Sequence, residues 1–219
     1  MDHANHHQIV ERIIRAYSST IIRLYCRIRF NIININILSK LCGFLPEEGL
    51  VADVGCGFGL FLLYYCSNRP DLNYVGYDLN AQRIGEARQA AARLGFKQIV
   101  FHERDVREDT SLLPCSTVFM LDLIHHLRPP VREELVREAY NQLRPGGMLI
   151  IKDILTRPYW KMMFTYILDK VMMNGFTQYL SESEMRSLLE RNHFAVTQET
   201  LRDPLPYPHV IYIARKKEK

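Results

Sequence analysis

Glycine occupies every second position in one short stretch, Asp53-Val54-Gly55-Cys56-Gly57-Phe58-Gly59. Glycine permits a sharp turn and a close approach of the backbone to a ligand, and the helix-like run that follows offers unpaired N–H groups at its start. Asp78 lies 23 residues after Gly55, at the predicted end of the next strand, where a carboxylate can accept both hydroxyls of a ribose. These residues predict a nucleotide or nucleoside site.

The glycine spacing separates two kinds of cofactor. The dinucleotide fingerprint G-x-G-x-x-G requires glycine at position 60, but that residue is Leu60 and the third glycine is Gly59. The spacing therefore disfavours a cofactor that contains a pyrophosphate.

Strand-like and helix-like segments alternate around these residues. The predicted strands are residues 50–55, 74–77, 98–102, 117–121 and 148–152, with helices at 60–67, 81–94 and 130–143 and closing strands at 195–200 and 209–214. Ser181 and Glu184 form a capping box that opens a further helix. This alternation predicts an α/β fold: a Rossmann-like seven-stranded sheet with helices on both faces.

Residues 1–45 form a predicted N-terminal helical extension, and residues 46–219 form the main domain. From Val10 to Ile28 the apolar residues fall on one arc of a helical wheel and the arginines on the opposite arc, which predicts one amphipathic basic helix. It either packs on the core, covers a pocket as a lid, or contacts a membrane surface. An aromatic and Met-rich stretch at about 156–180 fits the alternation poorly and is predicted to be a helical insertion.

The glycine stretch resembles the first motif, (D/E)-x-G-x-G-x-G, of the class I S-adenosylmethionine-dependent methyltransferases. The resemblance runs from about Leu50 to Lys152 and includes Leu143-Arg144-Pro145-Gly146-Gly147, which is similar to the family's turn into the fifth strand. It implies S-adenosyl-L-methionine as the cofactor. The cofactor-binding residues that it implies are Asp53, Gly55, Cys56, Gly57, Gly59, Asp78, Leu79, Asp105, Val106 and Leu121.

The resemblance also implies individual roles. Asp78 holds the ribose, Leu79 lies against the adenine, and Asp105 accepts a hydrogen bond from the adenine amino group. Leu121 and Asp122 match the end of the fourth strand, beside the methionine moiety. The small-molecule branch, which includes quinone-ring methyltransferases, often has a His-His-Leu here, and this chain has His125-His126-Leu127.

Methyl transfer needs mainly in-line placement of the acceptor, because the sulfonium already activates the methyl group. If the acceptor is a phenol or an enol, His125 or His126 can take its proton, since histidine titrates near neutral pH. Asp122 either orients one histidine or meets the amino group of the cofactor. The alternative is that the histidines only cap a helix or sit satisfied in a loop.

The favoured function is methylation, at oxygen or carbon, of a small apolar or aromatic acceptor such as a lipid-like molecule, quinone or phenol. The insertion suits such an acceptor, although core packing explains the same residues: Trp160, Met162, Met163, Phe164, Tyr166, Met172, Met173, Phe176 and Tyr179. The alternatives are an RNA methyltransferase, suggested by the basic N-terminal end, and a non-catalytic binding protein that retains the fold. No nucleic acid partner is expected, because no dedicated RNA-binding domain is apparent.

The composition of the chain limits its fold class and its cellular location. The chain has 219 residues, of which 47% are hydrophobic, and a net charge of +4. That content suffices for a full core, and no charge-free stretch approaches the roughly 20 apolar residues of a spanning helix. The start of the chain lacks the pattern of a secretory signal. We expect a cytoplasmic protein, with peripheral contact at the inner face of the membrane as an option.

Five cysteines without a C-x-x-C pair predict reduced thiols, mostly in the core, and no metal site.

Overall fold

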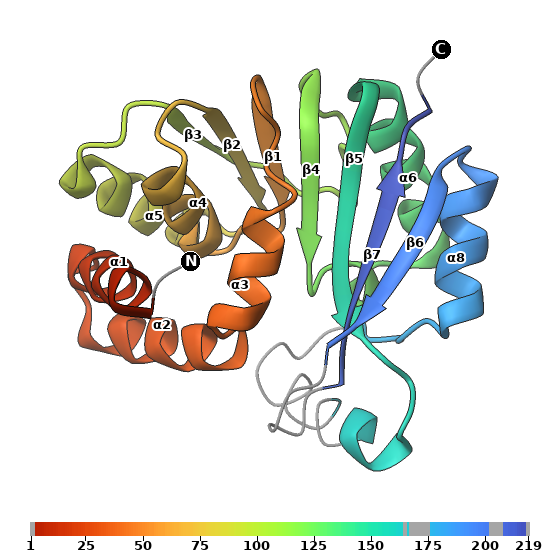
Figure 1. Ribbon diagram of the computed structural model, residues 1–219, viewed down its shortest axis with the longest axis horizontal. Helices are drawn as coiled ribbons and strands as arrows, with labels where there is room; N and C mark the ends of the chain where they lie inside the picture. The colour runs from red at the N-terminus through yellow and green to blue at the C-terminus, as the bar shows by residue number, and fades with distance from the viewer. Residues whose placement is uncertain (1–2, 164–165, 167–175, 202–207, 218–219) are drawn as a thin grey trace. The chain divides into compact units, whose positions relative to one another are not determined.

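A computed structural model describes residues 3–163, 166, 176–201 and 208–217. The contacts of the chain group into two units, Met1–Arg104 and Asp105–Lys219 (Figure 1). The domain boundary predicted between residues 45 and 46 lies at a different place from this division and stays a prediction. In the described part of the chain, no helix has both the length and the apolar content needed to cross a bilayer.

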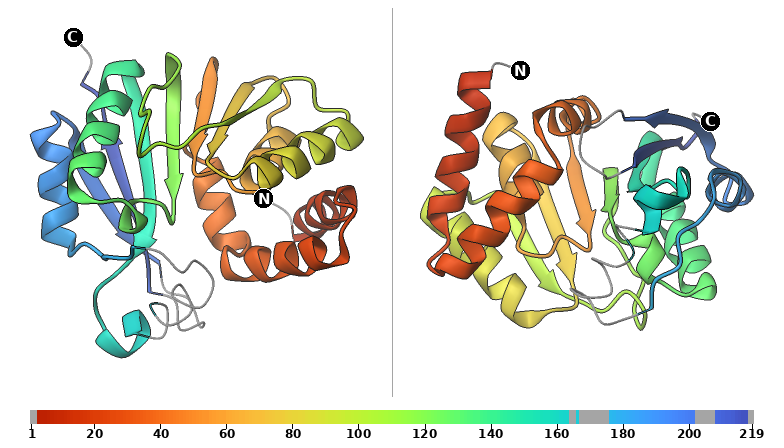
Figure 2. Two further views of the ribbon diagram at one scale, coloured as in Figure 1. Left: turned by 180° about the vertical axis from the view of Figure 1, so that it is seen from behind. Right: turned by 90° about the horizontal axis from the view of Figure 1, so that it is seen from below.

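The N-terminal region contains three helices, α1 (His3–Ala16), α2 (Thr20–Ile32) and α3 (Ile35–Cys42). The prediction of one continuous helix from Val10 to Ile28 is wrong. Ser19 has an extended backbone and its side chain caps the N-terminus of α2, so the chain leaves the first helix and starts a second one. Figure 2 shows α1 and α2 meeting at an angle.

The break changes which residues face the core. In α1, Val10, Ile13 and Ile14 are buried as expected, but α2 buries Ile22, Cys26 and Phe30. A continuous helix would have turned Ile21, Leu24 and Ile28 toward the core, but these three residues are exposed.

Three parallel strands form the sheet of the first unit, in the order β3-β2-β1. They are β1 (Leu50–Val54), β2 (Asn73–Asp78) and β3 (Ile99–Glu103), joined by α4 (Leu60–Asn68) and α5 (Ala81–Leu94). Asn80 caps the N-terminus of α5, and Gly95 ends it in the left-handed conformation. Since the strands are parallel, their carboxyl ends lie at the same edge of the sheet.

Four strands form the sheet of the second unit, in the order β4-β5-β7-β6. The strands are β4 (Cys115–Leu121), β5 (Leu143–Ile154), β6 (Ala195–Thr200) and β7 (His209–Arg215). β4 and β5 are parallel, whereas β7 is antiparallel to both of its neighbours. The helices of this unit include η1 (Ile124–His126), α6 (Pro129–Gln142) and α8 (Glu182–Arg191), and α8 begins with the predicted capping box.

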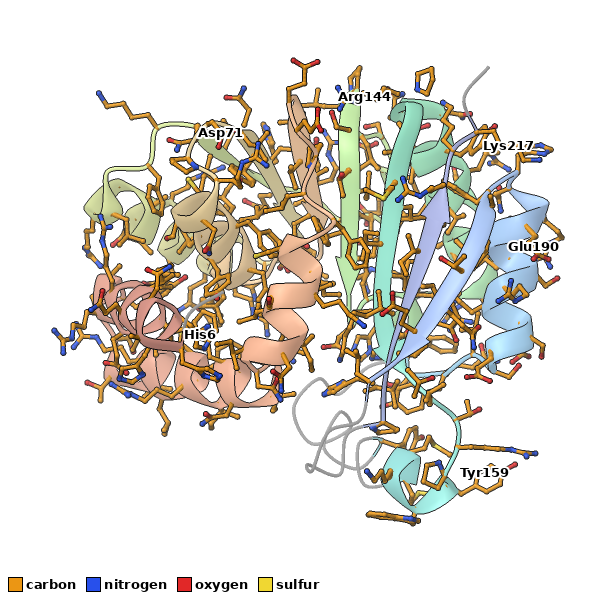
Figure 3. The ribbon with its side chains drawn as sticks, viewed as in Figure 1. His6, Asp71, Arg144, Tyr159, Glu190 and Lys217 are labelled. Carbon is orange, nitrogen blue, oxygen red and sulfur yellow. The ribbon has the colours of Figure 1, made fainter. Side chains whose placement is uncertain are left out.

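The sequence predicted a turn before Met148 and an insertion at about 156–180 in this unit. β5 begins at Leu143, so the residues predicted as a turn before Met148 belong to the strand, where the pairing with β4 shifts register between Cys115 and Thr117. Of the predicted insertion at 156–180, residues 164–165 and 167–175 lie outside the described residues. The described part includes a short helix that bears Tyr159 and lies beyond the end of β5 (Figure 3).

The predicted core position of the cysteines is confirmed for four of the five. Cys26, Cys56, Cys66 and Cys115 are buried free thiols, and Cys42 is half-buried.

Candidate functional site

The glycine stretch makes a tight turn between β1 and α4. Gly55, Gly57 and Gly59 have φ angles of 79°, 55° and 75°, in a region that residues other than glycine seldom adopt. The backbone N–H groups of Gly55 and Cys56 donate to the carbonyl of Tyr77 at 2.7 and 3.0 Å. The turn is therefore anchored to the last residues of β2.

The side chain of Asp78 binds the backbone of the glycine turn. Its side chain is buried at the end of β2, where Oδ2 accepts from the N–H of Gly57 and Oδ1 from the N–H of Asn80, both at 2.9 Å. A carboxylate has about four acceptor positions, so these two bonds leave capacity for the two hydroxyls of a ribose. The structure thus places Asp78 at the glycine turn, as the sequence predicts, and its ribose-binding role stays a prediction.

The glycines differ in the space around them. A Cβ on Gly57 would meet nothing within 4 Å, so open space lies beside the backbone that Asp78 holds. A Cβ on Gly59 would come within 2.7 Å of the Phe101 ring and 3.1 Å of Ala87. Gly57 therefore lines a cradle, whereas Gly59 allows α4, α5 and β3 to pack closely.

Asp53 lies behind the turn on β1 and is buried. Burial, the largest cause, raises the pKa of its carboxyl to about 8; the charge of Asp78 acts in the same direction and Arg29 opposes it. Within the described residues its Oδ2 has no hydrogen-bond partner. An open glycine cradle held by the Asp78 carboxylate, with a buried carboxyl oxygen on the strand that leads into it and no partner for that oxygen among the described residues, fits a nucleoside cofactor.

Two further predicted residues of this unit differ in exposure. Leu79 is exposed directly after Asp78, which leaves its side chain available to a flat ring. Cys56 is buried, and burial together with the charges of Asp53 and Asp78 raises the pKa of its thiol well above the usual range. Cys56 therefore fills space beside the turn and is a poor nucleophile.

A contact from Tyr17, the residue after α1, reaches the same turn. The Tyr17 hydroxyl donates to the carbonyl of Phe58 at 2.6 Å, and the guanidinium of Arg83 lies 5.6 Å from the centre of the Phe58 ring. The amphipathic pattern predicted that Tyr17 is buried, but it contained no signal that its hydroxyl would hold the glycine loop.

The remaining predicted cofactor residues belong to the second unit. Val106 and Leu121 are buried. Asp105 forms a two-pronged ion pair with Arg107, whose Nε lies 2.8 Å from Oδ1 and Nη2 2.5 Å from Oδ2. The hydrogen bonds from Arg107 lower the pKa of the Asp105 carboxyl. Its predicted role toward adenine stays a prediction.

Asp122 and Lys152 form an ion pair at the carboxyl ends of β4 and β5. Lys152 Nζ lies 2.5 Å from Asp122 Oδ1, and the N–H of Asp122 donates to the Lys152 carbonyl at 2.9 Å. Lys152 is buried, and Asp122 has a φ of 55°, unusual for a residue other than glycine. The sequence reasoning missed Lys152, although a lysine at the end of an apolar strand is itself a signal.

His125 is buried and pairs with Asp153. Its Nδ1 lies 2.5 Å from Asp153 Oδ1, which also accepts from the N–H of Ile154 at 2.8 Å. An Nδ1–H donated to a carboxylate makes Nε2 the nitrogen that can accept a proton. The sequence suggested Asp122 as the carboxylate that orients a histidine, but Asp153 makes this bond. The sequence did contain a signal for Asp153, because Lys152 and Asp153 are two consecutive charged residues on an otherwise apolar strand.

The end of the insertion packs around these histidines. The N–H of Gln178 donates to the His125 carbonyl at 2.8 Å, and the Tyr179 ring lies 4.9 Å from the His125 ring. His126 Nδ1 lies 3.3 Å from the carbonyl of Phe176. Buried Arg132 donates to the carbonyls of Ile124 and Gln178.

A cleft of about 350 Å³ lies beside this segment, between α6 and α8. Arg132, Gln178 and Tyr179 contribute to its wall. Tyr179 thus contacts both the His125 ring and the cleft.

The chain is similar to known proteins in sequence and in fold. It is 30% identical over 118 residues to a carboxy-S-adenosyl-L-methionine synthase of Campylobacter jejuni, over 54% of this chain and 48% of that protein. The chain thus spans about half the length of this relative.

Two solved structures share its fold. The S-adenosylmethionine-dependent methyltransferase SibL matches with a TM-score of 0.72 and 17% identity, over 99% of this chain and 70% of that one. An O-methyltransferase family 2 protein from Planctomyces limnophilus, in complex with apigenin, matches with a TM-score of 0.66 and 19% identity, over 83% and 57%. These likenesses confirm the predicted α/β fold.

The sequence model of one family, described as a methyltransferase domain, matches residues 26–199. This range contains the glycine turn, Asp78 and the His125–Asp153 pair. The chain therefore belongs to the methyltransferase domain family, among the class I S-adenosylmethionine-dependent methyltransferases, whose cofactor is S-adenosyl-L-methionine.

Proposed function

We propose that this protein transfers the methyl group of S-adenosylmethionine to an oxygen or an acidic carbon of a small, apolar or aromatic acceptor. The observation that carries the proposal is the buried pair of His125 and Asp153, at 2.5 Å. A phenol or enol must lose a proton as it gains a methyl group, and His125 Nε2 is the atom that takes this proton. When bound, the cofactor supplies the activated methyl group.

Asp153 is the positioning residue for this step. It holds the Nδ1 proton of His125 and stabilises the imidazolium that forms when Nε2 is protonated. General-base help is typically worth 10²- to 10⁴-fold in rate. Alignment of the acceptor supplies more, about 7–11 kcal/mol, so the base adds to a rate that in-line placement mainly sets.

Exposed side chains of the insertion support an apolar acceptor. Tyr159, Trp160, Met163 and Phe176 are exposed, so core packing does not account for them. Exposed aromatic and methionine side chains suit binding of a flat apolar ring. The solved structure of the Planctomyces limnophilus protein with apigenin supports the same class of acceptor.

The name of the Campylobacter relative raises a second candidate, in which the product is a carboxylated form of the cofactor. One assay separates the candidates. The purified protein is incubated with S-adenosylmethionine labelled in its methyl group, in separate reactions with short-chain phenols and quinols, with total RNA, or with small carboxylic acids as carboxyl donors. Mass spectrometry then gives the mass of the nucleoside product.

Label in the phenol or quinol and formation of S-adenosylhomocysteine support the proposal. His125→Gln should lose at least about a hundredfold in kcat, while the neighbouring control His126→Gln keeps most of it. Label in RNA, or a nucleoside product with an added carboxyl group, would contradict the proposal.

A further inference from the structure

A row of aliphatic side chains faces outward from α2. Ile21, Leu24 and Ile28 are 81%, 59% and 48% exposed. Their spacing of three and four residues places them on one helix face, and the opposite face of α2, with Ile22, Cys26 and Phe30, is buried. We call Ile21, Leu24 and Ile28 the aliphatic row.

The aliphatic row lies on the face of α2 opposite to the buried residues. Exposed single aliphatic side chains are ordinary, but three on consecutive turns of one face mark an interaction surface. Ile21 is mostly exposed, and Leu24 and Ile28 are about half-exposed, so packing inside this unit accounts for only part of their apolar surface.

The charges beside the row indicate its partner. α2 contains Arg23, Arg27 and Arg29 and no acidic residue. Across residues 3–45 there are six basic residues, and Glu11, ion-paired with Arg27 at 2.8 Å, is the one acidic residue. Arg15 on α1 is strongly exposed.

This combination fits a lipid surface better than a second copy of the chain. Two identical basic faces would repel each other, whereas arginine stems extend along apolar surface and place their charges among phosphate groups. A basic helix with an aliphatic face lies in the plane of a bilayer, its apolar side chains at the headgroup–acyl boundary.

We propose that α2 docks this protein on an anionic lipid surface, with the aliphatic row inserted below the headgroups and the exposed side chains of Arg15 and Arg27 at the phosphates. The proposal is independent of the proposed methyl transfer, because it requires neither cofactor nor acceptor. The charge of the arginines sets the preference for anionic lipid, and the aliphatic row supplies the insertion.

Vesicle co-sedimentation of the full chain tests the proposal, with phosphatidylcholine vesicles made with and without phosphatidylglycerol. We expect at least about tenfold stronger partitioning onto the anionic vesicles, reduced by added salt. Leu24→Glu should lower partitioning about tenfold or more. The matched control is Leu113→Glu, which introduces the same change at a leucine that is 47% exposed in the other unit, and should partition like the unchanged protein.

Circular dichroism of each variant establishes that the fold is retained. Equal binding to both kinds of vesicle, no binding to either, or equal losses in Leu24→Glu and Leu113→Glu would each overturn the proposal. So would a dimer of the unchanged protein that Leu24→Glu converts to a monomer while vesicle binding stays the same, because the row would then join two copies.

Discussion

The carboxylate of Asp78 accepts a hydrogen bond from the backbone N–H of Gly57 at 2.9 Å, so the end of β2 and the glycine turn after β1 form one structural element. A second backbone bond, from Asn80, holds the other carboxylate oxygen. The side chain that we expect to bind the ribose is therefore already oriented by the backbone of the protein.

Asp78→Ala should weaken binding of S-adenosylmethionine. Two hydrogen bonds to a charged carboxylate contribute about 1.5–3 kcal/mol each, so the affinity should fall at least about a hundredfold. Isothermal titration calorimetry measures this. An unchanged dissociation constant would remove Asp78 from the cofactor site.

Gly57→Ala should weaken cofactor binding with little loss of stability beyond backbone strain. Gly95→Ala is a matched control, because Gly95 also has a positive φ (78° against 55°) and nothing within 4 Å of an added Cβ, but lies at the end of α5. We expect both variants to lose about 1–2 kcal/mol of stability, measured by urea unfolding, and only Gly57→Ala to lose affinity. Equal affinities would show that the space beside Gly57 is not the cradle.

Asp153→Asn should reduce kcat about a hundredfold with the dissociation constant of the cofactor unchanged. The amide cannot stabilise the imidazolium of His125, so the acid limb of the pH–rate profile should also change. Steady-state kinetics across pH measures both effects. A purely structural role for Asp153 would instead lower the melting temperature and leave the shape of the pH profile intact.

Asp122→Asn should destabilise the fold by leaving the buried Lys152 ammonium without its carboxylate. Removing one partner of a buried ion pair costs about 3–5 kcal/mol, and partial exposure of Asp122 places this case at the lower end. The double variant Asp122→Asn/Lys152→Met should recover most of that loss in urea unfolding. Additive losses would mean that the two side chains are not energetically coupled.

The stability of the protein without cofactor should fall as pH rises from about 4 to about 8. The Asp53 carboxyl keeps its proton in the folded state up to a pKa of about 8, whereas the unfolded chain releases it near 4, so unfolding is favoured by rising pH within that window. Asp53→Asn, which cannot ionise, should flatten this dependence in urea unfolding at pH 5 and pH 8. An unchanged slope would assign the pH dependence to other groups.

The sequence by itself determined the local chemistry of the first half of the site. Glycine spacing predicted a turn because glycine adopts the positive φ angles found at Gly55, Gly57 and Gly59 without the steric cost that other residues have. Parallel β1 and β2 then required Asp78 to emerge at the same edge. Caps at Asn80 and Ser181 marked helix starts correctly, because capping depends on residues only a few positions apart.

Tertiary structure alone decided the partners that come from distant segments. Asp153 rather than Asp122 bonds to His125, because the register of β4 against β5 decides which strand residue lies beside the loop, and no local pattern encodes that register. The outward position of the aliphatic row depended likewise on one break at Ser19. A helical wheel assumes a continuous helix, and the interruption turned the following apolar residues from the core to the surface.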